Sequence, residues 1–66
     1  MREYIIVLKS HDTGRWIAYG YEGAQPFPTY EEADKTRQEV IDTDKRRTEA
    51  YRRPLTWTDS LVALLK

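Results

Sequence analysis

Apolar and polar side chains alternate through the first 21 residues in the pattern of a β-hairpin. Two runs rich in β-branched and aromatic residues, 2–9 and 15–21, are joined by a short loop in which Gly14 can supply the positive φ of a tight turn. The first run is apolar at both alternating sets of positions: Tyr4, Ile6 and Leu8 on one face, Ile5 and Val7 on the other. We therefore expect this strand to lie inside a sheet or to be covered on both faces.

A loop and then a helix follow the hairpin. Residues 22–28 contain Gly23 and two prolines, which favour a loop because proline cannot donate a hydrogen bond to a strand ladder. Thr29 and Glu32 form the Thr-x-x-Glu pattern of a helix N-terminus, in which each side chain bonds the backbone of the other residue. The apolar positions on one side of such a helix are Tyr30, Ala33, Val40 and Ile41. The spacing predicts a helix over residues 30–42.

Two interpretations of the chain beyond Asp42 stay open. In the first, the helix continues until Pro54 stops it, with acids early and bases late, the order that suits the helix dipole. In the second, the helix breaks at residues 42–44 and residues 48–55 form a third strand beside the hairpin. The order of the charges favours the longer helix.

The C-terminal segment is expected to form a short second helix. Thr56 or Thr58 can cap it. Its apolar positions follow the i, i+4, i+7, i+8 spacing of one helix face: Trp57, Leu61, Leu64 and Leu65. The sequence therefore predicts a single small α+β domain over residues 1–66. In it, an N-terminal antiparallel hairpin, extended in one interpretation to a three-stranded sheet, packs against one long helix, with a short C-terminal helix.

Composition limits how such a domain can be stabilised. The chain has 66 residues and zero formal net charge, with no cysteine and one histidine. A chain of this size buries only about 60% of the surface that its unfolded form exposes, so its margin of stability is small. The absence of cysteine excludes disulfides and thiolate metal ligands, and we expect no metal and no cofactor. A homodimer is the remaining way to bury more surface.

No segment of the sequence is apolar over the length that a membrane span needs. The longest apolar run, residues 61–65, is far shorter than the roughly 20 residues required. The N-terminus has charges close to its start and lacks the apolar stretch of a signal peptide. We therefore expect a soluble, cytoplasmic protein, which also fits the lack of cysteine.

The sequence offers no set of residues suited to catalysis. Ser10, His11 and Asp12 are the residue types of a catalytic triad, but a triad needs side chains that converge from separate elements, and these are consecutive turn residues. The carboxylates of residues 31–44 lack an apolar cleft that would shift their pKa values. The glycines are not spaced for phosphate binding. We expect a protein that is not an enzyme and has no catalytic residues.

The zero net charge hides two adjacent charged segments. Residues 31–44 carry six acids and two bases, a balance of −4, whereas residues 45–53 carry five bases and one acid, a balance of +4. Arg, Tyr and Trp dominate protein-binding hot spots. We therefore expect a partner protein to contact five residues in and beside the basic segment: Arg46, Tyr51, Arg52, Arg53 and Trp57.

Two further interpretations of the charged segments stay open. Basic side chains with nearby aromatics can hold phosphates and stack on bases, although a net charge of zero is unlike most nucleic-acid-binding domains. In that interpretation, nucleic acid would contact Lys45, Arg46, Arg47, Arg52 and Arg53. On a continuous helix these bases would present one stripe, because Lys45 and Arg52, like Arg46 and Arg53, are seven residues apart. Otherwise the basic segment pairs with the acidic segment, within one chain or across a dimer.

Parts of the chain resemble two known modules. Residues 12–16, Asp-Thr-Gly-Arg-Trp, are similar to the hairpin of HicB-type antitoxins, and residues 29–33 are similar to the helix start of plant ethylene-response-type DNA-binding domains. Both resemblances lie within residues 4–41 and consist of turn and capping signals, so we assign no family and transfer no functional residue. The hypothesis from the sequence is a non-enzymatic regulator or inhibitor, antitoxin-like or phage-encoded, that binds a partner protein, with a homodimer as an option. The alternative is a nucleic-acid-binding accessory protein.

Overall fold

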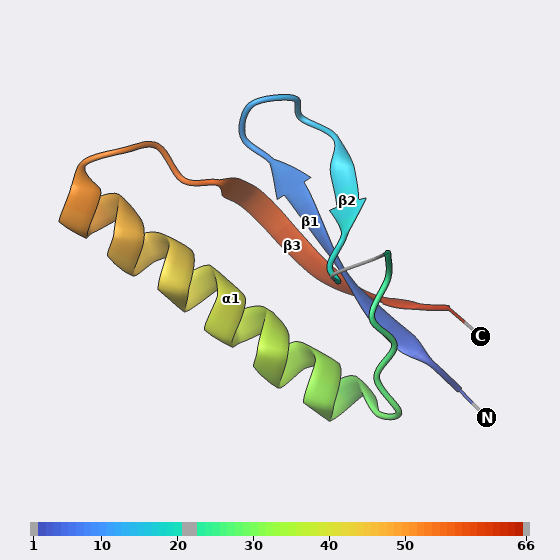
Figure 1. Ribbon diagram of the computed structural model, residues 1–66. Coiled ribbons are helices and arrows are strands. Elements are labelled where there is room, and N and C mark those ends of the chain that lie inside the picture. Colours follow the sequence, from blue (N-terminus) through green and yellow to red (C-terminus); the bar gives the residue numbers. More distant parts are fainter. Residues whose placement is uncertain (1, 21–22, 66) are drawn as a thin grey trace.

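The computed structural model describes residues 2–20 and 23–65 and confirms the α+β class. In this part of the chain, a three-stranded antiparallel sheet in the order β2-β1-β3 lies against one helix (Figure 1). The elements are β1 (Tyr4–Ser10), β2 (Trp16–Ala18), α1 (Tyr30–Tyr51) and β3 (Trp57–Leu64). α1 spans 22 residues, but the described chain contains no helix that is both long and apolar enough to cross a membrane.

β1 is the central strand of the sheet, as its two apolar faces predict. It pairs with β2 on one side and with β3 on the other, both antiparallel. Ile6 and Leu8 point toward α1 and are 0% and 2% exposed. Ile5 and Val7 point to the opposite face, where each is half-buried. The strand therefore supplies the core on one face and an apolar surface on the other.

The hairpin of β1 and β2 is confirmed, but β2 is shorter than expected. Gly14 has the predicted positive φ, at 70°, and its N–H donates to the carbonyl of Ser10 at 2.9 Å. β2 ends at Ala18 because the chain turns back soon afterwards, and the carbonyl of Gly23 lies where a Cβ of Gly20 would be. The expected last residue of the strand, Tyr21, lies outside the described residues.

The longer interpretation of the helix is confirmed. Thr29 is the N-cap, and its hydroxyl accepts a hydrogen bond from the N–H of Glu32 at 3.2 Å, as the capping pattern predicts. α1 then continues without a break to Tyr51, so the alternative of a third strand over residues 48–55 is wrong. The helix ends at Arg52, which adopts a left-handed conformation with φ 51°.

The predicted C-terminal helix is wrong, because residues 57–64 form β3 instead. β3 pairs with the full length of β1, from Tyr4 opposite Leu64 to Lys9 opposite Asp59. An apolar run as short as residues 61–65 fits both a helix and a strand, so its periodicity alone does not decide between them. The free edge of β1 decides, because pairing there satisfies a whole row of backbone hydrogen bonds.

The hydrophobic core lies between α1 and the β1–β3 half of the sheet. Ile6, Leu8 and Ala33 form its fully buried centre. Partly buried side chains surround them: Tyr4, Tyr19, Phe27, Val40, Ile41, Trp57 and Val62. The connection after β2 is also tied to the sheet, since Phe27 and Tyr4 exchange two backbone hydrogen bonds of 2.7 and 2.9 Å. So small a buried centre agrees with the thin margin of stability expected from chain length.

Candidate functional site

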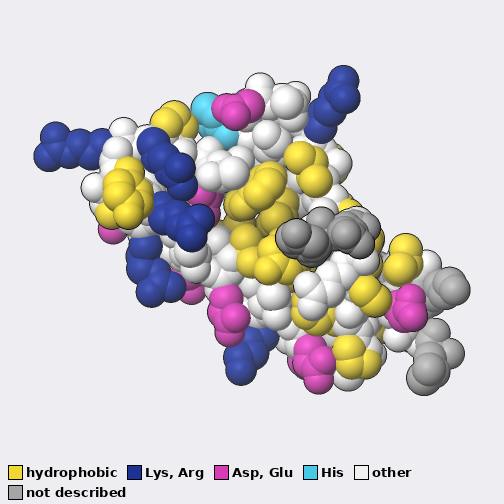
Figure 2. Space-filling model, viewed as in Figure 1, with side chains coloured by type: hydrophobic (Ala, Val, Ile, Leu, Met, Phe, Trp, Pro, Cys, Tyr) yellow, Lys and Arg dark blue, Asp and Glu magenta, His cyan; other side chains and the backbone are white. Residues whose placement is uncertain are grey.

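A groove lies between α1, the start of β3 and Tyr19, which follows β2. α1 packs against β1 and β3, but its backbone does not lie close to the backbone of β2. Ile17 of β2 points to the same side as Leu8, its partner on β1, and is nevertheless 46% exposed. The groove has a volume of about 430 Å³. Figure 2 shows hydrophobic side chains gathered in this central region, between the helix and the hairpin.

The walls of the groove combine apolar, hydroxyl and charged side chains. Tyr19, which follows β2, and Trp57, at the start of β3, supply the aromatic surface. The helix wall repeats at spacings of three and four residues, which is one side of an α-helix: Thr36, Glu39, Val40, Thr43, Asp44 and Arg47. Because Val40 is the one apolar residue on this side of α1, among hydroxyl and charged residues, the sequence of this side looks like that of a solvent-exposed side.

Asp44 lies at the bottom of the groove and holds the α1–β3 connection in place. Its carboxylate is 4% exposed and accepts hydrogen bonds from the backbone N–H groups of Thr56 and Trp57, both at 3.1 Å. Burial alone would raise the pKa of Asp44, but hydrogen bonds from Trp57 and Thr56 and the charge of Arg53 outweigh it and hold the pKa below the ordinary value of 3.8. Asp44 therefore has a structural role, at the place where the connection passes the helix.

The basic side chains gather around the C-terminal end of α1 rather than along one stripe (Figure 2). Arg47 lines the groove, whereas Lys45 lines a smaller cavity of about 270 Å³ on the other flank of the helix. Arg46 lies between them, exposed, and donates from Nε to the carbonyl of Asp42 at 3.4 Å. Consecutive helical residues are about 100° apart, so three neighbouring bases face three directions.

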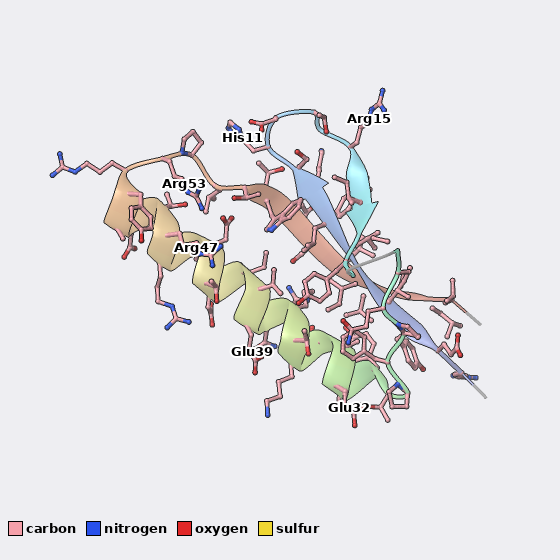
Figure 3. All side chains as sticks on the ribbon, in the orientation of Figure 1. His11, Arg15, Glu32, Glu39, Arg47 and Arg53 are labelled. Atoms are coloured by element: carbon pink, nitrogen blue, oxygen red, sulfur yellow. The ribbon has the colours of Figure 1, made fainter. Side chains whose placement is uncertain are left out.

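Arg52 and Arg53 are not part of the helix and do not continue a helical stripe. Arg52 is the left-handed residue that ends α1, and Arg53 lies on the connection to β3, beside a shallow cavity that His11 also lines (Figure 3). Tyr51 is 73% exposed on the last turn of α1. Trp57 packs against the core and contributes to the groove. The predicted protein-contact residues thus surround one end of the molecule, and Trp57 is the one of the five that lines the groove. There it meets Arg47, which the sequence named as a contact only in the nucleic-acid interpretation.

The acidic and basic segments do not pair with each other in the described part of the chain. Within residues 2–20 and 23–65, the Lys or Arg ion pair shorter than 4 Å is Arg37 with Asp34, at 2.8 Å, and Nδ1 of His11 also lies 3.5 Å from the carboxylate of Asp12. Hydrogen bonds from Arg37 and from Gln38 lower the pKa of Asp34. The cations of the described basic segment are therefore available to a partner.

The turn residues that resemble a triad are arranged as part of the scaffold. The backbone N–H of His11 donates to the carbonyl of Thr56 at 2.9 Å, which joins the hairpin turn to the α1–β3 connection. Thr13 completes the turn, with its hydroxyl accepting from the N–H of Arg15 at 3.2 Å. Among the described residues, no three His, Cys, Asp or Glu side chains lie close enough to hold a metal ion.

The sequence did not point to three features of this site: Tyr19 and Val40 as groove residues, and Asp44 as a buried anchor. Asp44 stands among exposed acids, and its bonding partners are 12 and 13 residues away, so only the fold reveals its role. The helical spacing of Val40, Thr43 and Arg47 was a usable signal for the groove wall.

The chain matches no family model, no curated protein and no solved structure.

Proposed function

We propose that this chain is a non-enzymatic protein-binding domain, a small regulator or inhibitor that receives a segment of a partner protein in the groove beside α1. The observation that carries the proposal is the uncovered half of the inner sheet face. α1 leaves β2 open, and the groove there combines the aromatic surface of Tyr19 and Trp57 with the free cation of Arg47.

The size and lining of the groove suit a short peptide segment. A volume of about 430 Å³ falls in the usual range of binding pockets, roughly 300–1,000 Å³. The apolar part can hold one or two apolar side chains. Glu39 and Asp44 also line the groove, but Asp44 already accepts two backbone N–H groups and neither carboxylate lies within 4 Å of Arg47, so Arg47 can bind an acidic group beside the apolar side chains. We therefore expect a partner segment that places a carboxylate next to an apolar anchor.

Charge reversal at neighbouring positions tests this proposal. Arg47→Glu should remove most partner capture, whereas Arg46→Glu, with the same charge change one residue away and outside the groove, should leave most of it. The measurement is affinity capture from a lysate of the native host, quantified by mass spectrometry for the wild type and both variants. Proteins retained equally by the wild type and Arg47→Glu would contradict binding in the groove.

Arg52 and Arg53 belong to the same proposed contact surface, at its outer end. Reversing both charges is expected to weaken capture, because Arg53 lies close to Asp44 at the end of the groove. A double variant that captures the partner at the wild-type level would restrict the surface to Arg47 and its neighbours.

Nucleic acid is a second candidate partner, favoured by the basic side chains around the end of α1, which form no ion pair within 4 Å in the described residues. Phosphate contacts depend on overall charge more than on one groove, so Arg46→Glu and Arg47→Glu should weaken such binding similarly. A gel-shift titration with single-stranded and duplex oligonucleotides would show a complex that weakens steeply as salt is raised. The lack of any complex at low salt would remove this candidate.

A further inference from the structure

The face of the sheet that points away from α1, here called the outer face, is not covered by any described element. The strand pairings define its members, because directly opposed residues point to the same side. They are Ile5, Val7 and Lys9 on β1, Trp16 and Ala18 on β2, and Asp59, Leu61 and Ala63 on β3. Six of these eight side chains are apolar.

An outer face of this composition is unusual for an antiparallel sheet with one helical layer. Such sheets commonly carry polar side chains on the solvent side. Here Trp16 and Leu61 are 44% and 42% exposed, and Ile5 and Val7 lie between them, on the central strand. A contiguous apolar surface of this kind marks an interaction site.

The charges of the outer face make it compatible with a copy of itself. Lys9 and Asp59 are opposed across β1 and β3 at one end of the face, and the rest of it is uncharged. The face is therefore neutral, so two copies meet without net repulsion. A two-fold axis that runs across the strands at the level of Val7 and Leu61 would bring the apolar centres of the two outer faces together. The Lys9–Asp59 pair of each copy would then lie at the rim of the interface.

The edges of the sheet are less suited to pairing with another copy. β2 has only three residues, which makes a short edge. On β3, the side chain of Asp59 accepts from the N–H of Ser60 at 2.8 Å, and Arg37 donates to the hydroxyl of Ser60 at 3.0 Å. The first contact occupies a backbone donor of β3, whereas the second lies on the helix side of the strand. The occupied donor and the shortness of β2 favour association through the faces over association through the edges.

We propose that the outer face binds a second copy of this chain and forms a two-fold symmetric dimer of stacked sheets. The area of the outer face limits how strongly two copies can bind. Rows of seven residues on β1 and β3 and of three on β2, at about 3.3 Å per residue and about 4.8 Å between strands, give roughly 270 Å² per copy, or roughly 540 Å² in projection for two copies. Stable interfaces hide about 1,200–2,000 Å², so this dimer is weak and depends on concentration.

Sedimentation velocity over about 10 µM to 1 mM tests the proposal, since mass action favours the dimer at the upper end. The wild type and Leu64→Glu should dimerise, and Leu61→Glu should stay monomeric. Leu64 lies on the same strand and is 57% exposed, but it points to the helix side, so it is the matched control. A wild type that is monomeric at 1 mM, or a Leu61→Glu variant that dimerises like it, would overturn the proposal.

Two further measurements keep the test decisive. Trp16→Glu changes a different strand of the outer face and should also abolish dimerisation, which covers the case in which Leu61→Glu does not fold by circular dichroism. Arg47→Glu lies in the groove and should dimerise like the wild type. Loss of partner capture without loss of the dimer, or the reverse, would then separate the groove from the outer face.

Discussion

Asp44 shows how one side chain can determine the path of a connection. The carboxylate is buried, yet it stays ionised because two backbone N–H groups point at it from the connection between α1 and β3. Without those bonds the same N–H groups would have no acceptor, and the backbone of Trp57 would no longer be held where its side chain packs against the core. A buried acceptor with two donors is a more demanding arrangement than an exposed ion pair.

Replacing Asp44 with Asn is expected to lower the free energy of unfolding by about 1–3 kcal/mol at pH 7, because the charge-assisted bonds are lost. The folded pKa of Asp44 is depressed, so its contribution is present above the unfolded pKa of 3.8 and disappears as the pH falls through the folded pKa. Urea unfolding at pH 7 and at about pH 2.5 should therefore show a difference between wild type and variant that shrinks in acid.

Asp42→Asn provides the control, since Asp42 lies two residues away on the same helix with its side chain exposed. It should change the stability by no more than about 0.5 kcal/mol. An equal loss in both variants, or an Asp44→Asn loss that does not change with pH, would show that Asp44 does not act through these hydrogen bonds.

At the scale of the element, α1 ends on a strained residue. Arg52 has φ 51°, in the left-handed region where a Cβ is unfavourable and where glycine is common at helix ends. Arg52→Gly should raise the free energy of unfolding by about 1 kcal/mol by removing this strain, and the midpoint of thermal unfolding by about 4–8 °C. Arg52→Ala keeps the Cβ and removes the charge, so a similar gain from it would point to charge rather than backbone strain.

The elements of this fold differ in how far local sequence determines them. α1 could be predicted from both ends, because Thr29 caps its start by accepting from the N–H of Glu32 and a proline follows its end. β3 could not, since residues 61–65 are apolar at every position and fit either period. What makes them a strand is the second edge of β1, a partner more than 50 residues away in the sequence.

The same distinction applies to the candidate site. The basic segment was visible as a run of charge, and it does surround one end of α1. Its helical stripe was not realised, because α1 ends before Arg52. The groove depends on where the helix lies across the sheet, and that position is set by the packing of Ala33 against Ile6 and Leu8. Such placement is a tertiary property and has no local signal.

At the scale of the whole molecule, one helix is too narrow to cover a three-stranded sheet. α1 covers the inner face of β1 and β3, which leaves β2 on the inner face, and the outer face of the sheet, without a covering helix. Both proposed interfaces thus have the same cause, which is that one helix covers only part of one face of the sheet. In a chain of this length, two such surfaces also mean that most apolar side chains are only half-buried.

The neighbours Ile5 and Ile6 test this division of the molecule into a core face and an outer face. Ile6 is fully buried, so Ile6→Ala should lower the free energy of unfolding by about 2–5 kcal/mol, a large part of the roughly 3–10 kcal/mol expected for a domain of this size. Ile5 is half-buried on the outer face, so Ile5→Ala should cost clearly less. Urea unfolding at low micromolar concentration, where a weak dimer contributes little, makes the comparison. Equal losses would mean that the outer face is packed as tightly as the core, and the two-layer description would fail.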